Sequence, residues 1–289
     1  MNKITIAKLN ALIERYNEEG AMTVRRCYYV LLSKGLIKET NSAYGTLSKL
    51  LVKARVEGDL PWRVIIDNSR NIIRRPTYSS FEESFEETEE YFKLNSMEQQ
   101  DNYIEVWVEK DTASAGISTI TYPLDIPLVV ARGFSSATYV KNAVDRFMKI
   151  EKPIHIIYIS DFDPEGNYFP ELFKTQLKER FNFAAEITIT KLSLTKNDIE
   201  ENNLVWIPIK WKSKKSEEKQ MQKAYFREYI EANGMRKVEL DAMAGNVLSE
   251  KLQVALRELI DFDIVQRNEE LSKECLEEWK KENLKEVKA

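Results

Sequence analysis

Three acidic residues stand directly after apolar stretches of the chain, where they could hold a metal ion. Glu109 follows residues 104–108, and Asp161 and Asp163 follow residues 154–159. Two carboxylates separated by one residue can project to the same side of an extended segment, so we expect Asp161 and Asp163 to point the same way. Carboxylate oxygens suit Mg²⁺, which keeps coordination positions for phosphate oxygens. The pattern predicts a site for Mg²⁺, or for Mn²⁺ as a substitute, at Glu109, Asp161 and Asp163.

An Asp-x-Asp pair alone is also typical of a turn or a helix cap, so the surrounding elements decide between the two interpretations. Apolar runs rich in β-branched residues alternate here with amphipathic helical patterns, which is typical of a parallel sheet covered on both faces. The runs are residues 104–108, 127–131, 154–159 and 187–192. Ligands of such sheets bind at the carboxyl ends of the strands. We therefore predict an α/β domain with a Rossmann-like, mostly parallel sheet over residues 103–289, ending in C-terminal helices.

A basic residue and two serines after the second run form a candidate phosphate site. Arg132 is followed by Gly133, and Ser135 and Ser136 come just before a helical pattern. A helix N-terminus presents unpaired backbone N–H groups and a positive dipole end, both of which favour phosphate. Arg132, Ser135 and Ser136 are therefore predicted phosphate contacts, and simple capping of the helix by the serines is an equal alternative.

Residues 1–76 have the pattern of a winged-helix-like module. Apolar residues at helical spacing predict three helices, and residues 64–66 predict a short strand. Residues 1–80 carry 14 Lys or Arg against 7 Asp or Glu, although the whole chain has a net charge of −4. This excess predicts that the module binds double-stranded DNA, with ordinary surface charge as the alternative. The basic residues of the third helix that we assign to DNA are Lys49, Lys53 and Arg55.

Residues 77–102 predict an acidic linker helix between the two parts. Six glutamates lie within residues 82–90, and Phe81, Phe85 and Phe92 keep a helical spacing that would bury one side. A solvated linker explains this pattern, and an imitation of DNA that shields the basic module is the alternative.

Several of these motifs together resemble the TOPRIM domain of the topoisomerase VI A-subunit family, which includes the transesterase that makes meiotic double-strand breaks. The matching segments, in the order of that family, are Val108-Glu109-Lys110, Arg132-Gly133-Phe134-Ser135-Ser136, Asp161-Phe162-Asp163-Pro164-x-Gly166, the stretch from Leu194-Thr195 to Asn203-Leu204, and Val238-Glu239-Leu240-Asp241-Ala242. The resemblance implies a TOPRIM fold, a phosphate-binding Lys110, and Glu239 and Asp241 as a second carboxylate edge near the metal. It also implies a homodimer.

The resemblance extends to the segment Thr23-Val24-Arg25-Arg26-Cys27-Tyr28-Tyr29. In that family a similar helix carries an arginine and, four residues later, the tyrosine that attacks DNA. This aligns Tyr29 with the nucleophile, Arg25 with its phosphate-binding neighbour, and Arg26 with a further DNA contact. Tyr28 falls on the apolar stripe of the helix, so periodicity predicts that Tyr29 faces outward. An ordinary, partly buried tyrosine is the alternative.

The function that this resemblance implies is magnesium-dependent cleavage of duplex DNA by tyrosine transesterification, with Tyr29, Arg25 and Glu109 as catalytic residues. A tyrosine hydroxyl has a pKa near 10 and needs help to attack a phosphodiester at neutral pH. The alternatives are a hydrolytic TOPRIM nuclease, in which water attacks, and a non-catalytic DNA-binding protein. The sequence contains no Gly-x4-Gly-Lys-Ser/Thr loop, so we expect any ATPase to be a separate subunit.

The remaining features of the sequence bear on localisation. No apolar run approaches the length of a membrane span, and the first residues have no signal-peptide pattern. Cys27 and Cys275 form no pair typical of a disulfide framework or a zinc site. We therefore expect a cytoplasmic protein that is not associated with a membrane.

Overall fold

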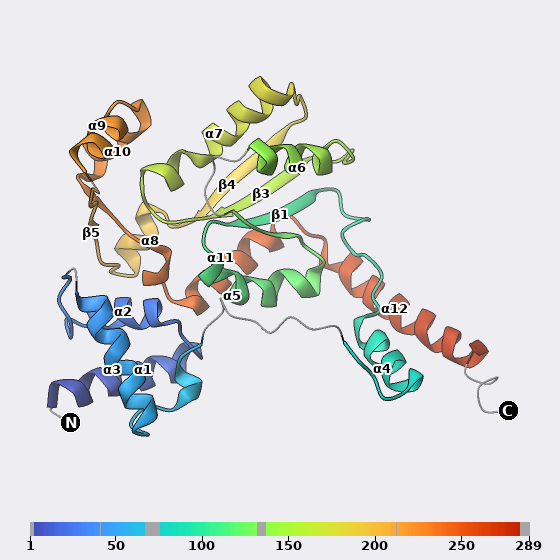
Figure 1. Ribbon diagram of the computed structural model, residues 1–289. Helices are drawn as coiled ribbons and strands as arrows, with labels where there is room; N and C mark the ends of the chain where they lie inside the picture. Colours follow the sequence, from blue (N-terminus) through green and yellow to red (C-terminus); the bar gives the residue numbers. More distant parts are fainter. Residues whose placement is uncertain (1–2, 41, 67–75, 132–136, 212, 284–289) are drawn as a thin grey trace.

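The computed structural model describes residues 3–40, 42–66, 76–131, 137–211 and 213–283 (Figure 1). Within these ranges a parallel sheet of four strands, in the order β2-β1-β3-β4, forms the centre of the molecule. The strands are β1 (Tyr103–Val108), β2 (Leu128–Val130), β3 (Ile154–Ile159) and β4 (Ile187–Ser193). The α/β class and the parallel sheet are therefore confirmed.

Helices cover both faces of this sheet, as Figure 1 shows. One face carries α5 (Asp111–Thr121) and α11 (Gly245–Arg257), and the other carries α6 (Ala137–Phe147) and α7 (Pro164–Phe181). Strand side chains alternate between the two cores: Val106 and Val108 of β1 pack on the first side and Trp107 on the second. The apolar runs are continuous in the sequence because both faces are buried.

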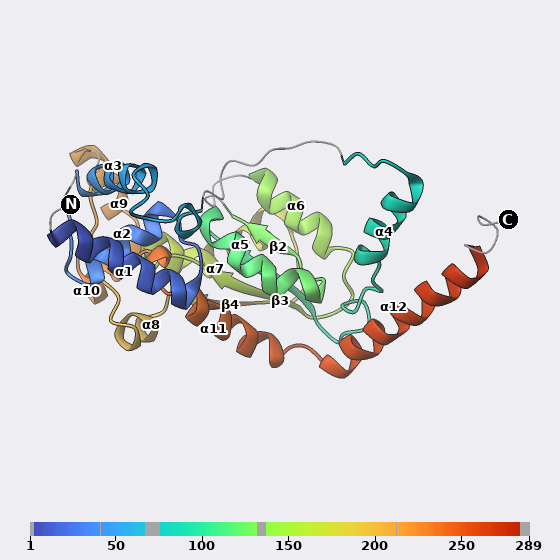
Figure 2. The ribbon, with the colours of Figure 1, turned by 90° about the horizontal axis from the view of Figure 1, so that it is seen from below.

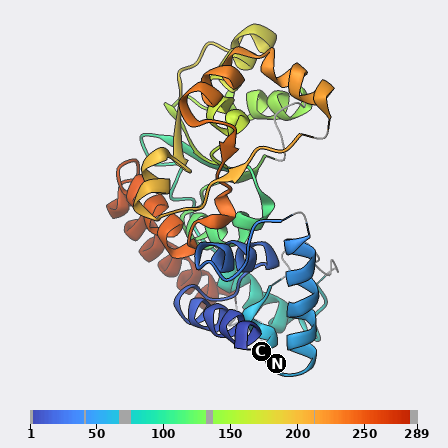
Figure 3. The same ribbon diagram turned by 90° about the vertical axis from the view of Figure 1, so that its left-hand side faces the viewer.

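The N-terminal module consists of helices packed around their own apolar core (Figures 1 and 3). They are α1 (Lys3–Glu19), α2 (Val24–Ser33) and α3 (Ala43–Val56). The predicted strand at 64–66 is wrong. A 3-10 turn, η1 (Trp62–Val64), is followed by a single bridge from Ile65 to Met22. Met22 lies in the segment between α1 and α2, and this segment is too short to form a longer β-ladder.

An arm formed by two helices projects from the other end of the sheet (Figure 2). The predicted acidic helix is present as α4 (Phe81–Tyr91), and it packs on α12 (Phe262–Asn283). The rings of Phe85 and Trp279 stack with centroids 4.9 Å apart, and Lys280 forms an ion pair with Glu89 at 2.9 Å. The expectation that Phe92 is buried is wrong, because it lies beyond the end of α4 and is 43 % exposed.

The chain between β4 and α11 brings the two parts of the molecule together. It forms α8 (Lys196–Glu201), β5 (Ile207–Pro208), α9 (Lys214–Met221), α10 (Ala224–Asn233), β6 (Arg236–Lys237) and η3 (Leu240–Ala242). Ile207 of β5 belongs to the core of the N-terminal module, and η3 packs against α2. Among the described helices, none is both long and apolar enough to cross a membrane.

Candidate functional site

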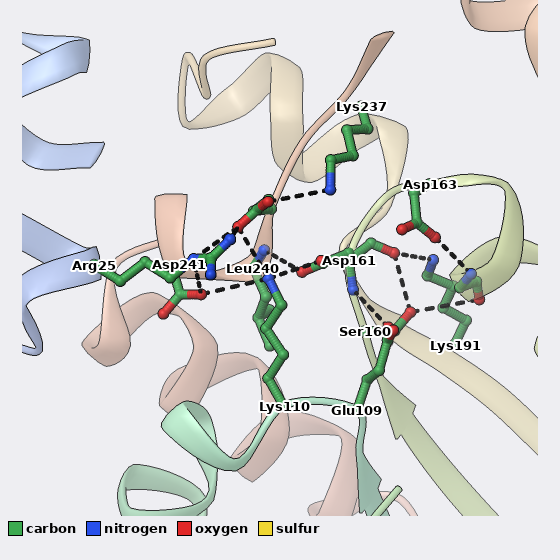
Figure 4. A network of polar contacts seen from close by, with 12 residues as sticks. Arg25, Glu109, Lys110, Ser160, Asp161, Asp163, Lys191, Lys237, Leu240 and Asp241 are labelled. Atoms are coloured by element: carbon green, nitrogen blue, oxygen red, sulfur yellow. Dashed lines mark hydrogen bonds and ion pairs between the residues drawn. The ribbon is translucent and has the colours of Figure 1, made fainter. Parts of the chain in front are cut away.

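Glu109 and Asp161 meet at the carboxyl edge of the sheet, as the sequence predicts (Figure 4). β1 and β3 are neighbours in register, and Glu109 N donates to the carbonyl oxygen of Ile159 at 2.9 Å. The backbone N–H of Asp161 in turn donates to Oε2 of Glu109 at 3.4 Å. Strand pairing therefore fixes the relative positions of these two acidic residues, although 52 positions separate them in the sequence.

Asp161 is buried, and both of its carboxylate oxygens have partners. Oδ1 accepts a hydrogen bond from Leu240 N at 2.7 Å, which ties β3 to the start of η3. Oδ2 forms an ion pair with Lys110 Nζ at 2.8 Å. The side chain therefore points towards the segment that contains Glu239 and Asp241 (Figure 4).

Asp163 points in a different direction from Asp161, so the prediction that the two carboxylates share one side is wrong. Asp163 is the N-cap of α7, and its Oδ1 accepts a hydrogen bond from Gly166 N at 2.7 Å. The unpaired N–H groups of the helix orient this carboxylate, which is the capping role that the sequence left open. Within the described residues, Gly166 N is the only hydrogen-bond partner of the Asp163 side chain.

A close approach between α7 and the end of β3 requires glycine at position 166. A Cβ atom at this position would lie 2.5 Å from the carbonyl oxygen of Asp161 and 2.8 Å from Oγ of Ser160. Ser160 is fully buried and donates to the same carbonyl oxygen at 3.1 Å. The loop that presents Asp161 and Asp163 is therefore packed too tightly for any side chain at Gly166.

The second acidic pair, Glu239 and Asp241, is held by cations from three segments. Lys110 Nζ lies 3.1 Å from Glu239 Oε2 and 3.5 Å from Asp241 Oδ2. Arg25 Nε donates to Glu239 Oε2 at 2.9 Å, and Lys237 Nζ lies 3.1 Å from Glu239 Oε1. The resemblance suggested a carboxylate edge near a metal, and in the structure this edge is already neutralised by protein side chains.

The two sides of the site differ in their charge balance. Burial, followed by the charges of Asp163 and Asp161, raises the pKa of Glu109 to about 7. Burial also raises the pKa of Asp163. Burial opposes ionisation of Glu239 as well, but Lys110, Lys237 and Arg25 outweigh it and hold the pKa of Glu239 at about 2. Among the described residues, no cation lies within ion-pair distance of Glu109 or Asp163, whereas Lys110, Lys237 and Arg25 all pair with Glu239.

Lys191, in β4, is a member of the site that sequence reasoning missed. Its Nζ donates to the carbonyl oxygen of Asp161 at 2.9 Å and also contacts Oδ1 of Asn167. Burial lowers the pKa of Lys191 to about 8, although the charge of Asp163 opposes this effect. The signal in the sequence was a single lysine within a β-rich run, at a position that the parallel register brings close to Asp161.

Glu109, Asp161 and Asp163 bring carboxylate oxygens to one edge of the sheet, but not to one point. In the conformation described, no group of three acidic, histidine or cysteine side chains among the described residues converges closely enough to hold a metal ion. Asp163 is turned to its helix, and Asp161 is turned to Lys110. The donor chemistry nevertheless fits, because all three side chains offer the hard oxygen ligands that Mg²⁺ prefers.

Tyr29 lies beside the second acidic pair, and the prediction that it faces outward is wrong. It is 5 % exposed, because η3 packs against α2 and covers that side of the helix. Burial and then the nearby Glu239 carboxylate raise the pKa of its hydroxyl, whereas Arg25 opposes this effect. Tyr28 is buried as well, and the two rings meet edge to face at 5.3 Å.

Arg26 also lies in the contact between the N-terminal module and the sheet. It donates to Glu19 Oε1 at 2.9 Å and to the carbonyl oxygens of Asp241 at 3.1 Å and Ala242 at 2.7 Å. Thr23 caps α2 by accepting a hydrogen bond from Arg26 N at 3.1 Å. In this conformation Arg26 joins the two parts of the molecule and is not presented to a ligand.

The remaining predicted DNA and phosphate contacts are distributed over separate places. Lys49 and Lys53 are exposed on α3, as predicted, and Arg55 lies over the ring of Trp62 at 4.8 Å. Lys110 lies between the acidic residues, with only 22 % of its side chain exposed. The predicted phosphate site at Arg132, Ser135 and Ser136 lies outside the described residues.

Neither a scan against protein-family models nor a search of curated proteins gave a match. The resemblance to the topoisomerase VI A-subunit family therefore rests on the residues quoted above.

Proposed function

We propose that this protein cleaves double-stranded DNA with a magnesium ion held by Glu109, Asp161 and Asp163. The observation that carries the proposal is the meeting of Glu109 and Asp161 at the carboxyl edge of β1 and β3, where burial and the charges of Asp163 and Asp161 raise the pKa of Glu109 to about 7. Ligands of parallel sheets bind at this edge. Carboxylates that lie close together there repel one another, and a bound cation would offset the repulsion. When bound, the ion would stabilise negative charge on the phosphate oxygens during cleavage.

The order of motifs supports a TOPRIM-type centre of the topoisomerase VI A kind, with Tyr29 as the nucleophile. The structure brings α2 against η3, so that the Tyr29 side chain lies beside Arg25 and Glu239, which is 210 positions away in the chain. In this proposal the Tyr29 oxygen forms a bond to phosphorus and the bond to the 3′ oxygen breaks. The hydroxyl proton leaves Tyr29, and the departing 3′ oxygen takes up a proton.

Glu109 would act in this step as a ligand of the ion, because a carboxylate that holds a cation is not free to accept a proton. Its raised pKa of about 7 belongs to the metal-free protein. Tyr29 is covered by the Arg25–Glu239 contact in the conformation described, so DNA would reach it only after α2 moves away from η3. Arg25 would then be released to bind the phosphate.

Hydrolysis by water is the second candidate, and the burial of Tyr29 favours it. Tyr29 is 5 % exposed and the pKa of its hydroxyl is raised, both of which are unfavourable for a nucleophile in this conformation. In this alternative, the same carboxylates hold the ion and Tyr29 only packs between the two parts of the molecule.

DNA would bind through the N-terminal module, which we propose to be winged-helix-like. Lys49 and Lys53 are exposed on one side of α3, where they could contact phosphates of a duplex. Paired breaks would require a homodimer, and strand passage would require a separate ATPase subunit, as the resemblance implies.

The test is cleavage of a supercoiled plasmid in Mg²⁺ or Mn²⁺, stopped with detergent and analysed with and without protease. Linear DNA that enters the gel only after protease treatment, and is lost in Tyr29→Phe and Glu109→Gln but kept in Tyr28→Phe, would establish transesterification. Tyr28 is the matched control because it is a neighbouring buried tyrosine of the same helix. Cleavage that survives Tyr29→Phe but not Glu109→Gln would establish hydrolysis. DNA binding without cleavage by any form would reject both.

A further inference from the structure

Lys110 places a positive charge at the centre of the second acidic edge. Its Nζ lies 2.8 Å from Asp161 Oδ2, 3.1 Å from Glu239 Oε2 and 3.5 Å from Asp241 Oδ2. These carboxylates come from three places in the fold. Asp161 follows the end of β3, Glu239 lies between β6 and η3, and Asp241 belongs to η3. Figure 4 shows the Lys110 ammonium group lying between the side chains of Asp161 and Asp241. Lys110 itself directly follows the proposed metal ligand Glu109.

The charges around Lys110 balance without any metal. Asp161, Glu239 and Asp241 bring three negative charges. Three cations face them at ion-pair distances, namely Lys110, Arg25 and Lys237. A second divalent ion here would have to displace the ammonium group and would meet the positive charges of Arg25 and Lys237. The Coulomb repulsion is strong in a site this buried.

The neighbouring half of the site is different. Within the described residues, Glu109 and Asp163 form no ion pair at all, and their closest polar contacts are backbone N–H groups of Asp161 and Gly166. Two-metal centres that act on phosphates place their ions about 4 Å apart, so that one stabilises the attacking oxygen and the other the leaving oxygen. Among the described residues, Glu109 and Asp163 at the first position have no ion pair. Asp161, the third proposed ligand, is paired with Lys110, which occupies the second position.

We propose that Lys110 stands in for the second metal ion, so that this centre binds a single divalent cation and uses the ammonium group as its second positive charge. The inference rests on the proposed metal centre at Glu109, Asp161 and Asp163 and specifies its composition. Lys110 is a positioning residue in the free protein, where it holds Asp161 and the Glu239–Asp241 segment together. With DNA bound, its ammonium group would lie beside the phosphate.

The experiment counts bound Mn²⁺ per chain by electron paramagnetic resonance, with the purified full-length protein in the absence of DNA. The wild-type chain is expected to bind one ion, Lys110→Met two, and Lys110→Arg one, because arginine keeps the charge. Lys191→Met is the matched control: Lys191 is also buried beside Asp161, but it contacts a carbonyl and an amide oxygen, not a carboxylate. This control is expected to bind one ion. If Lys110→Met does not fold, Lys110→Gln replaces it.

The outcomes separate this inference from the proposed function. Two ions in the wild-type chain, or one ion in Lys110→Met, would overturn the role of Lys110 and leave the metal centre standing. A second ion in both Lys110→Met and Lys191→Met would also overturn it, because any loss of positive charge would then admit the metal. No ion in the wild-type chain would reject the metal centre itself, and the present inference with it.

Discussion

Arg25 of α2 and Glu239 before η3 form an ion pair across the contact between the N-terminal module and the sheet. Arg25 Nε donates to Glu239 Oε2 at 2.9 Å, and Arg25 Nη2 contacts the same oxygen. The Glu239 side chain is 6 % exposed, so its charge depends on these partners. The pair therefore couples the position of the N-terminal module to the chemistry of the candidate site.

Removal of Arg25 is expected to destabilise the protein moderately. Glu239 keeps Lys110 and Lys237 as partners, so we expect Arg25→Ala to lower the free energy of unfolding by about 1–2 kcal/mol. Denaturation in urea measures the change. Lys34→Ala is the matched control, because Lys34 pairs with the exposed Glu14 and its loss should cost no more than about 0.5 kcal/mol. Equal effects of the two substitutions would contradict this role of Arg25.

Substitution of Gly166 is expected to disturb the loop that carries Asp161 and Asp163. Gly166→Ala places a Cβ within 2.5 Å of a backbone oxygen, so the loop must shift, at a cost of about 1–3 kcal/mol. Mn²⁺ affinity should fall with it. Gly116→Ala is the control, because Gly116 is exposed in α5 with no heavy atom near its added Cβ. That change should stabilise the helix by up to about 1 kcal/mol. Unchanged stability and Mn²⁺ affinity in Gly166→Ala would show that the loop tolerates a side chain.

The raised pKa of Glu109 predicts a pH dependence that Mg²⁺ removes. In the metal-free protein the pKa of Glu109 is raised from 4.5 to about 7, so between these values the folded state binds more protons than the unfolded state. The free energy of unfolding must therefore fall as the pH rises through this window, by at most about 3 kcal/mol. Above the window the carboxylate is charged and available to the metal.

Mg²⁺ should accordingly raise the melting temperature more at about pH 8 than at about pH 5. Thermal unfolding at the two pH values, with and without Mg²⁺, measures this difference. It should shrink in Glu109→Gln, which cannot ionise. An equal gain at both pH values in the wild-type chain would mean that Glu109 is not a ligand.

A second buried ion pair, between Glu105 and Arg146, is predicted to hold α6 to the sheet. Glu105 is fully buried and accepts hydrogen bonds from Arg146 Nε at 2.9 Å, Tyr103 at 2.8 Å and Trp107 at 2.6 Å. Arg146→Met would leave this charge without its cation, at a cost of about 2–4 kcal/mol in the free energy of unfolding. Lys141→Met, on the same helix, removes an exposed pair with Asp145 and should cost less than about 0.5 kcal/mol. Urea denaturation that finds similar losses in both variants would refute the prediction.

The sequence by itself determined the sheet. Each predicted run became a parallel strand, because the central strands β1 and β3 are buried on both faces and continuous β-branched stretches leave little ambiguity. The sequence also placed Glu109 and Asp161 at one edge, since neighbouring parallel strands end at the same edge. Both predictions follow from patterns of neighbouring residues in the sequence.

Only the tertiary structure decided the directions and partners of the side chains. Asp163 caps the start of α7. The Asp-x-Asp spacing alone could not decide between capping and metal binding. Tyr29 was predicted to be exposed from the periodicity of its own helix, but η3, more than 200 residues later, covers it. Lys110 pairs with carboxylates that lie about 50 and about 130 positions away. Such contacts depend on how elements that are distant in the sequence pack together, so the residue pattern within one element cannot predict them.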